Sequence, residues 1–240
     1  MQNKIAVFDS GVGGLVLLKR LQKLLPYHDF LYFADNLNVP YGNKTQKEIE
    51  SIVSCNMQKI LSFKPQGVFV ACNTATSLCV ADLQTKYPSI IIDGILPDVA
   101  NVPKPCIVFC TSATANSKKI IGLDKDTFVF PLESCADMVE KGCSDNQLKL
   151  YLEQIFSGFN LYGFKSIFLG CTHYLHKKQV FESFGLPVFD NVGRATQAFA
   201  NNFKADSLNK KTKMKGKVTF FLSDNNESQY KKYLDFYARL

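Results

Sequence analysis

Two short segments of this chain share one pattern, in which a cysteine follows a buried strand. Residues 67–71 form an apolar run that leads into Cys72, and residues 166–170 form another that leads into Cys171. Apolar runs of this length are typical of buried parallel strands, and a helical pattern follows each cysteine. The repeat predicts two similar lobes, each of which presents one thiol at the carboxyl end of a strand.

Short apolar strands alternate with amphipathic helices along the chain, which is the pattern of an α/β protein with mainly parallel sheets flanked by helices. The predicted strands cover residues 5–8, 30–33, 67–71, 90–95, 107–110, 127–130, 167–169, 188–190 and 218–222. We expect two pseudo-symmetric lobes, with the active site in the cleft between them.

The lobe boundaries follow from the closing elements of the chain. The last strand and a helix with a stripe of Tyr230, Tyr233, Leu234 and Tyr237 are too few to form a third domain, so they are expected to pack on the first lobe. This predicts a first lobe of residues 1–95 plus 193–240 and a second lobe of residues 96–192.

Charge and apolar patterning argue against polymeric partners. The 28 basic and 21 acidic residues leave a formal charge of +7, which is too small to indicate a polyanion as partner. The lysine-rich residues 204–217 lack interleaved aromatic residues and are typical of a solvated connection, so no nucleic acid is expected. No apolar run reaches the length of a membrane span, and no export signal is visible.

Cysteine usage favours a reducing compartment. The eight cysteines are scattered and contain no CxxC pair, so neither a disulfide framework nor a metal site is indicated. We expect reduced thiols in a cytoplasmic protein. A zinc site built from Cys171, His173 and His176 would lack a fourth ligand.

The glycine-rich turn of residues 9–14 lies between a predicted strand and a helix N-terminus, where backbone N–H groups favour an anion. It is not a dinucleotide fingerprint, because Val16 stands where the third glycine would be. Asp9 is predicted to point into the ligand crevice from the end of its strand. A purely structural glycine turn is the alternative.

Cys72 and Cys171 stand apart from the other cysteines, which are expected to be structural. Each precedes a predicted helix N-terminus, which lowers a thiol pKa, and each is followed by side chains suited to a carboxylate. His173 is a candidate acid or base partner of Cys171, whereas His176 is expected to face solvent. Two weaker candidates are loops, Pro40-Tyr41-Gly42 and a hydroxyl-rich stretch with Thr111 and Thr114, either of which is also typical of a simple turn or helix cap.

Taken together, six segments resemble the glutamate racemases of the cofactor-independent aspartate/glutamate racemase superfamily. They are residues 9–14, 40–42, 71–74, 111–114, 138–142 and 170–174, and their order and spacing hold over nearly the whole chain. The resemblance implies interconversion of L- and D-glutamate for peptidoglycan synthesis, a homodimer, a small amino acid as ligand, and no cofactor or metal. Leu96 departs from the pattern, because an acidic residue is common there in glutamate racemases.

The resemblance also assigns roles to individual residues. It implies that Cys72 and Cys171 are the two acid/base thiols, that Asp9 assists the first and His173 the second, and that Glu140, with Glu133 as a rival, approaches His173. The residues that it implies in substrate binding are Ser10, Pro40, Tyr41, Gly42, Asn73, Thr74, Thr111, Thr114 and Thr172.

Two thiols suit inversion of an α-carbon, because one base must remove a proton from one face while an acid delivers another to the opposite face. Three alternatives remain. One is an aspartate or other amino-acid racemase of the same superfamily, and another is a hydrolase that uses only Cys171 and His173. The third is a non-catalytic nucleic-acid-binding protein.

Overall fold

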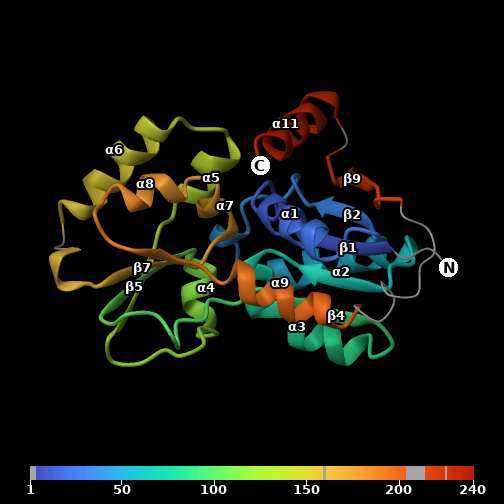
Figure 1. Cartoon of the computed structure of the whole chain (residues 1–240), viewed down its shortest axis with the longest axis horizontal. Helices are drawn as coiled ribbons and strands as arrows, with labels where there is room; N and C mark the ends of the chain where they lie inside the picture. Colours follow the sequence, from blue (N-terminus) through green and yellow to red (C-terminus); the bar gives the residue numbers. More distant parts are fainter. Residues whose placement is uncertain (1–3, 159–160, 204–213, 225) are drawn as a thin grey trace.

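The computed structural model describes residues 4–158, 161–203, 214–224 and 226–240, which form two lobes side by side (Figure 1). Each lobe is built on a sheet whose strands all run parallel. In the first sheet the order is β4 (Ile91–Gly94), β3 (Gly67–Val70), β1 (Lys4–Asp9), β2 (Asp29–Ala34) and β9 (Val218–Leu222). The predicted α/β fold class is therefore confirmed.

Alternation along β1 explains why the first sheet is covered on both faces. Ile5 and Val7 face one core, while Ala6 and Phe8 face the other. The first core is completed mainly by α1 (Leu15–Leu24), α9 (Val192–Asn201) and α11 (Glu227–Ala238), and the second by α2 (Gln46–Ser62) and α3 (Asn73–Lys86).

The predicted start of α2 is confirmed by its hydrogen bonds. The Thr45 side chain accepts from the Glu48 backbone N–H, and the Glu48 carboxylate accepts from the Thr45 N–H in return. This capping box satisfies two N–H groups that would have no partner inside the helix.

The second sheet has the order β6 (Thr127–Pro131), β5 (Cys106–Cys110), β7 (Ser166–Leu169) and β8 (Val188–Phe189). Its larger core includes residues of α5 (Cys135–Glu140), α6 (Asp145–Phe156), α7 (Thr172–Leu175) and α8 (Lys178–Glu182). The other face carries a smaller apolar cluster that includes Val99, Val108 and Phe168. A short helix, α4 (Ser112–Ser117), contacts both α3 and the 3₁₀ turn η1 (Tyr41–Asn43), so it lies between the lobes.

The closing elements pack on the first lobe. β9 pairs with β2 along its length, and α11 lies over β9 and α1 (Figure 1). Within α11 only Tyr233 of the predicted stripe is fully buried, because Tyr230 and Leu234 are each 39% exposed. Tyr237 of the stripe is partly buried against the same core, together with Phe236, which the stripe did not include. Most of the lysine-rich connection, residues 204–213, lies outside the described residues.

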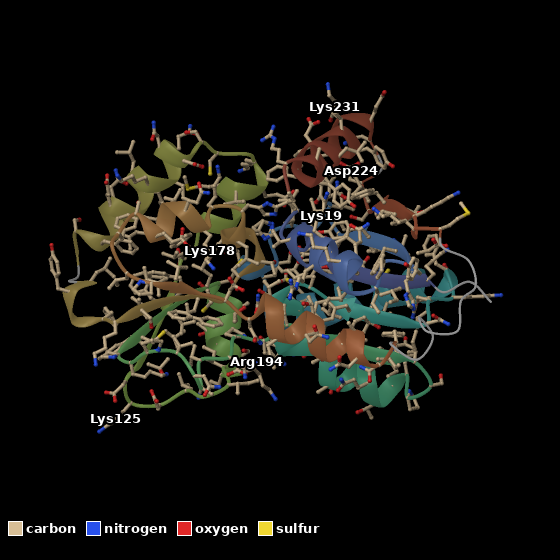
Figure 2. The ribbon with its side chains drawn as sticks, in the orientation of Figure 1. Lys19, Lys125, Lys178, Arg194, Asp224 and Lys231 are labelled. Atoms are coloured by element: carbon tan, nitrogen blue, oxygen red, sulfur yellow. The ribbon has the colours of Figure 1, made fainter. Side chains whose placement is uncertain are left out.

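Two polar contacts lie where the chain passes between the sheets. Asn191 donates its side-chain amide to the Leu96 carbonyl at 3.0 Å, and the Arg194 guanidinium pairs with Asp98 at 2.7 Å. Figure 2 shows Arg194 on α9. The domain boundaries near residues 96 and 193 stay a prediction.

The second-lobe core depends on Phe109, which is fully buried, with its ring centroid 5.3 Å from that of Phe156 and 5.9 Å from that of Phe181. Phe109→Ala should lower the free energy of unfolding by about 3–5 kcal/mol, because it leaves a cavity that neighbouring rings cannot fill. Leu150→Ala, at a position 61% exposed on α6, is the control and should change it by less than about 0.5 kcal/mol. Urea unfolding measures both, and equal values would contradict the assignment of Phe109 to the core.

Candidate active site

Two thiols line one cavity between the lobes. Cys72 follows β3 and precedes α3, while Cys171 follows β7 and precedes α7. The cavity volume is about 10 Å³, which is about the space that one water molecule needs. Its lining contains Ser10, Pro40, Tyr41, Gly42, Cys72, Asn73, Thr74, Thr111, Ala136, Cys171, Thr172 and His173.

Cys72 is a protonated thiol in this closed cleft. Burial raises its pKa to about 12, and the nearby charges of Asp9 and Cys171 act in the same direction. The Ser10 hydroxyl donates to its sulfur at 3.6 Å, which only partly offsets the effect of burial. The sequence-based expectation that the helix N-terminus lowers the thiol pKa is therefore wrong for Cys72, because desolvation outweighs the helix.

His173 is buried beside Cys171 and carries a proton at neutral pH. Burial alone would lower the pKa of its imidazole, but hydrogen bonds with Cys171 and Glu140 raise it well above its usual value. Its Nε2 lies 2.8 Å from Oε2 of Glu140. A proton donor therefore stands next to the second thiol.

Glu140 is an ionised carboxylate at the centre of the contact between the lobes. Although burial opposes ionisation, hydrogen bonds and charge from His173 and Lys232 lower its pKa to about 2. Of the two glutamates weighed from sequence, Glu140 contacts His173. Glu133 is exposed and lines a separate outer pocket with Gly42 and Ser112.

The turn at residues 9–14 was expected to bind an anion, and in the structure the carboxylate of Glu140 occupies that position. Its Oε2 accepts from the Val12 backbone N–H at 2.9 Å. A Cβ atom on Gly11 would lie 2.2 Å from that oxygen, and one on Gly13 would lie 2.5 Å from Oγ1 of Thr172. The turn therefore needs glycine so that the backbone of one lobe can approach the side chains of the other.

Asp9 also bridges the lobes. One of its carboxylate oxygens accepts from the Gly11 N–H at 2.8 Å, and the other accepts from the Thr172 hydroxyl at 3.2 Å. Burial raises the pKa of Asp9 to about 6, although the charge of His173 partly counters this. Asp9 thus has a pKa of about 6, and its charge acts on the Cys72 thiol.

Three hydroxyls from both lobes meet beside the cavity, which Thr74 and Thr111 line and Thr114 does not. Thr74 lies 2.9 Å from Thr111 and 3.1 Å from Thr114, measured between Oγ1 atoms. The Tyr41 hydroxyl instead donates to Asp35 at 2.6 Å, so it points into the first lobe while the rest of the residue lines the cavity.

The structure adds residues to which the sequence assigned no role at the site. Lys232 and Tyr233 on α11 donate to Glu140. His176 was expected to face solvent, but its Nε2 lies 2.9 Å from the Val12 carbonyl and its ring packs against Phe236. Burial lowers the pKa of His176 to about 4, so it is neutral.

Neither a metal centre nor a membrane segment emerges from the described residues. They contain no group of three or more histidine, cysteine or acidic side chains that could hold a metal ion, and none of their helices is long and apolar enough to span a bilayer. All eight cysteines are among them, as free thiols.

Comparison with known proteins gives the family. Glutamate racemase of Clostridium novyi (strain NT) is 35% identical over 93% of this chain and 92% of its own length. Glutamate racemase 2 of Bacillus subtilis (strain 168) is 34% identical over 92% and 88%. The chain belongs to the glutamate racemase family. No family model matches it.

Solved structures of the glutamate racemase family share the fold. The Thermus thermophilus glutamate racemase in complex with beta-chloro-D-alanine is 27% identical, with a TM-score of 0.83 over 98% of this chain and 93% of that one. The Francisella tularensis glutamate racemase in complex with D-glutamate is 23% identical, with a TM-score of 0.84 over 100% and 95%. The two-lobed architecture is therefore that of the glutamate racemases.

The raised pKa of Asp9 makes the stability of this glutamate racemase family member depend on pH. Since the folded-state pKa is about 6 against 3.8 in the unfolded chain, the contribution of Asp9 is complete below pH 4 and is lost as pH rises through 6. Asp9→Asn has no proton to lose. Its unfolding free energy relative to wild type should therefore rise by roughly 2–3 kcal/mol between pH 4 and pH 7.

Urea unfolding at several pH values measures this difference. Asp82→Asn, at an exposed position on α3, controls for the loss of one negative charge. A difference between Asp9→Asn and wild type that stays constant from pH 4 to pH 7 would show that Asp9 ionises normally.

Proposed function

We propose that this chain interconverts L- and D-glutamate by a two-base reaction without a cofactor, and that it supplies D-glutamate for peptidoglycan synthesis. The observation that carries the proposal is that one thiol from each lobe lines a single closed cavity. The names of the relatives give the substrate. A hydrolase would need only Cys171 and His173, and the buried Cys72 would have no role in its mechanism.

The chemistry follows from the position of the thiols. Inversion requires a thiolate on one face of the α-carbon and a thiol on the other. We assign proton removal from L-glutamate to Cys171 and from D-glutamate to Cys72. In the closed cleft Cys72 holds its proton, so it is ready to protonate the carbanion that forms when Cys171 acts as the base.

The lining supplies groups that stabilise the carbanion. Hydroxyl and amide donors on Ser10, Asn73, Thr74 and Thr172 surround the cavity, which has little room for water. Donors fixed in a site that excludes water stabilise developing charge more strongly than solvent does. The substrate ammonium contributes in the same way.

The remaining expectations from the resemblance are part of the proposal. We propose a homodimer in the cytoplasm, the acid/base roles of Asp9 and His173, and the substrate-binding roles of the residues that line the cavity. The two-sheet architecture and the shared cavity support the site assignments.

The two-base reaction predicts that neither thiol can replace the other. Cys72→Ala and Cys171→Ala should each lower the rate of racemisation at least about a hundredfold, because each removes one acid/base group. NMR of the α-proton of L- and D-glutamate in deuterium oxide measures both inversion and exchange. Cys55→Ala, at an exposed cysteine on α2, should match wild type, and near-wild-type racemisation by either active-site variant would sink the mechanism.

Substrate choice gives a second test. If the hydroxyls of Thr74, Thr111 and Thr114 receive the side-chain carboxylate of the substrate, alanine should be converted with a kcat/KM at least about a hundredfold below that of glutamate, because alanine has no such carboxylate to accept their hydrogen bonds. Measuring kcat/KM for glutamate, aspartate and alanine decides the class. Equal values for glutamate and alanine would contradict a dicarboxylate substrate, and a higher value for aspartate would move the assignment to an aspartate racemase.

A further inference from the structure

The surroundings of Glu140 point to a role for the C-terminal helix in the reaction. We propose that Lys232 and Tyr233 on α11 are positioning residues, which hold the Glu140 carboxylate so that it orients His173 toward Cys171. This inference rests on the proposed function, because it concerns the same site. It adds two residues from the far end of the chain to the machinery of the second thiol.

The two oxygens of Glu140 have separate sets of partners. Oε1 accepts from the Lys232 ammonium at 2.8 Å and from the Tyr233 hydroxyl at 3.2 Å. Oε2 accepts from the Val12 N–H at 2.9 Å and faces Nε2 of His173 at 2.8 Å. The α11 donors therefore occupy the oxygen that His173 does not use, and this fixes the rotation of the carboxylate about its last bond.

Lys232 also holds the backbone beneath Glu140. Its ammonium lies 3.3 Å from the Glu140 carbonyl oxygen, at the C-terminal end of α5. A cation at a helix C-terminus is favourable because the carbonyl groups there carry partial negative charge. One side chain thus fixes both the carboxylate and the end of the helix that carries it.

Charge explains why this arrangement needs a cation. The titratable groups that act on Glu140 and His173 are Cys171, Asp9, Tyr32, Lys232, Tyr233 and His176. Lys232 and the protonated His173 face the Glu140 carboxylate from opposite oxygens. Removing the ammonium would leave a buried carboxylate with fewer donors, and the carboxylate would turn to regain them at the expense of His173.

Chain neighbours provide the control. Lys232 is half-buried, with its ammonium 5.3 Å from the centre of the Tyr233 ring. Lys231 precedes it on the same helix but is exposed, and Figure 2 shows it on the outer side of α11. Lys231→Met removes the same charge from the same helix without touching Glu140.

The first experiment measures racemisation in both directions for Lys232→Met, Lys232→Arg, Tyr233→Phe and Lys231→Met in the full chain. We expect Lys232→Met to lower kcat about tenfold, which is the order of effect seen when a group that orients a functional histidine is removed. Its α-deuterium isotope effect should rise for L-glutamate more than for D-glutamate, because the step of Cys171 becomes slower. Lys232→Arg should recover most of the activity, and Lys231→Met should equal wild type.

The second experiment reads the same contact without relying on racemisation. Iodoacetamide alkylation of Cys171 and of the exposed Cys55 is followed by mass spectrometry in one sample, from pH 6 to pH 9. Loss of Lys232 should slow alkylation of Cys171 severalfold at neutral pH, while Cys55 on α2 serves as the internal reference. This measurement remains valid even if the wild-type chain does not racemise glutamate. Such a failure would overturn the proposed function but not the positioning role of Lys232.

Melting temperatures separate positioning from folding. A purely structural role for α11 would lower the melting temperature and slow both directions equally, with no change in either isotope effect. That result, or alkylation of Cys171 unchanged in both Lys232→Met and Tyr233→Phe, would overturn the proposal. Tyr233→Phe keeps the buried ring, so it tests the lost hydroxyl if Lys232→Met does not fold.

Discussion

The Glu140 carboxylate is charged, buried and shared between the two lobes. A charge without partners in a protein interior costs several kcal/mol, so its partners must be complete. Three of its four donors, Val12, Lys232 and Tyr233, belong to elements packed on the first sheet, although Glu140 itself belongs to α5 of the second lobe. The protonated state of His173 depends in turn on this carboxylate. The contacts of Glu140 that hold the two lobes together are therefore the same contacts that keep His173 protonated.

The glycine-rich turn after β1 uses its backbone N–H groups to bind carboxylates of the protein itself. Backbone N–H groups at such a turn favour an anion, and many proteins use them for a ligand phosphate. Here the N–H of Gly11 is taken by Asp9, and that of Val12 by Glu140. The absence of a side chain on Gly11 and Gly13 allows the second lobe to approach. The turn binds an anion that the protein itself supplies.

Much of this could be predicted from the sequence because it depends on local patterns. Short apolar runs of three to six residues mark the strands, and Cys72 and Cys171 follow two of them closely, which places both thiols at strand ends. The pKa of Cys72 was predicted in the wrong direction because the helix N-terminus is a local feature, whereas burial depends on the whole fold. Lys232 gave no signal, since it lies beside Lys231 on a charged helix. The two lysines differ only because α11 packs on the first lobe, which brings Lys232 to Glu140 and leaves Lys231 exposed.

The small volume of the cavity has a kinetic consequence. An amino acid does not fit into a space of about 10 Å³, so the residues that line the cavity must move apart before a substrate can enter. Association then proceeds at the diffusional rate multiplied by the fraction of time that the cleft is open. Solvent viscosity and the strength of the contacts across the cleft should therefore govern capture and release, quite apart from the chemistry of the thiols. In such a protein, product departure competes with the proton transfers for control of turnover.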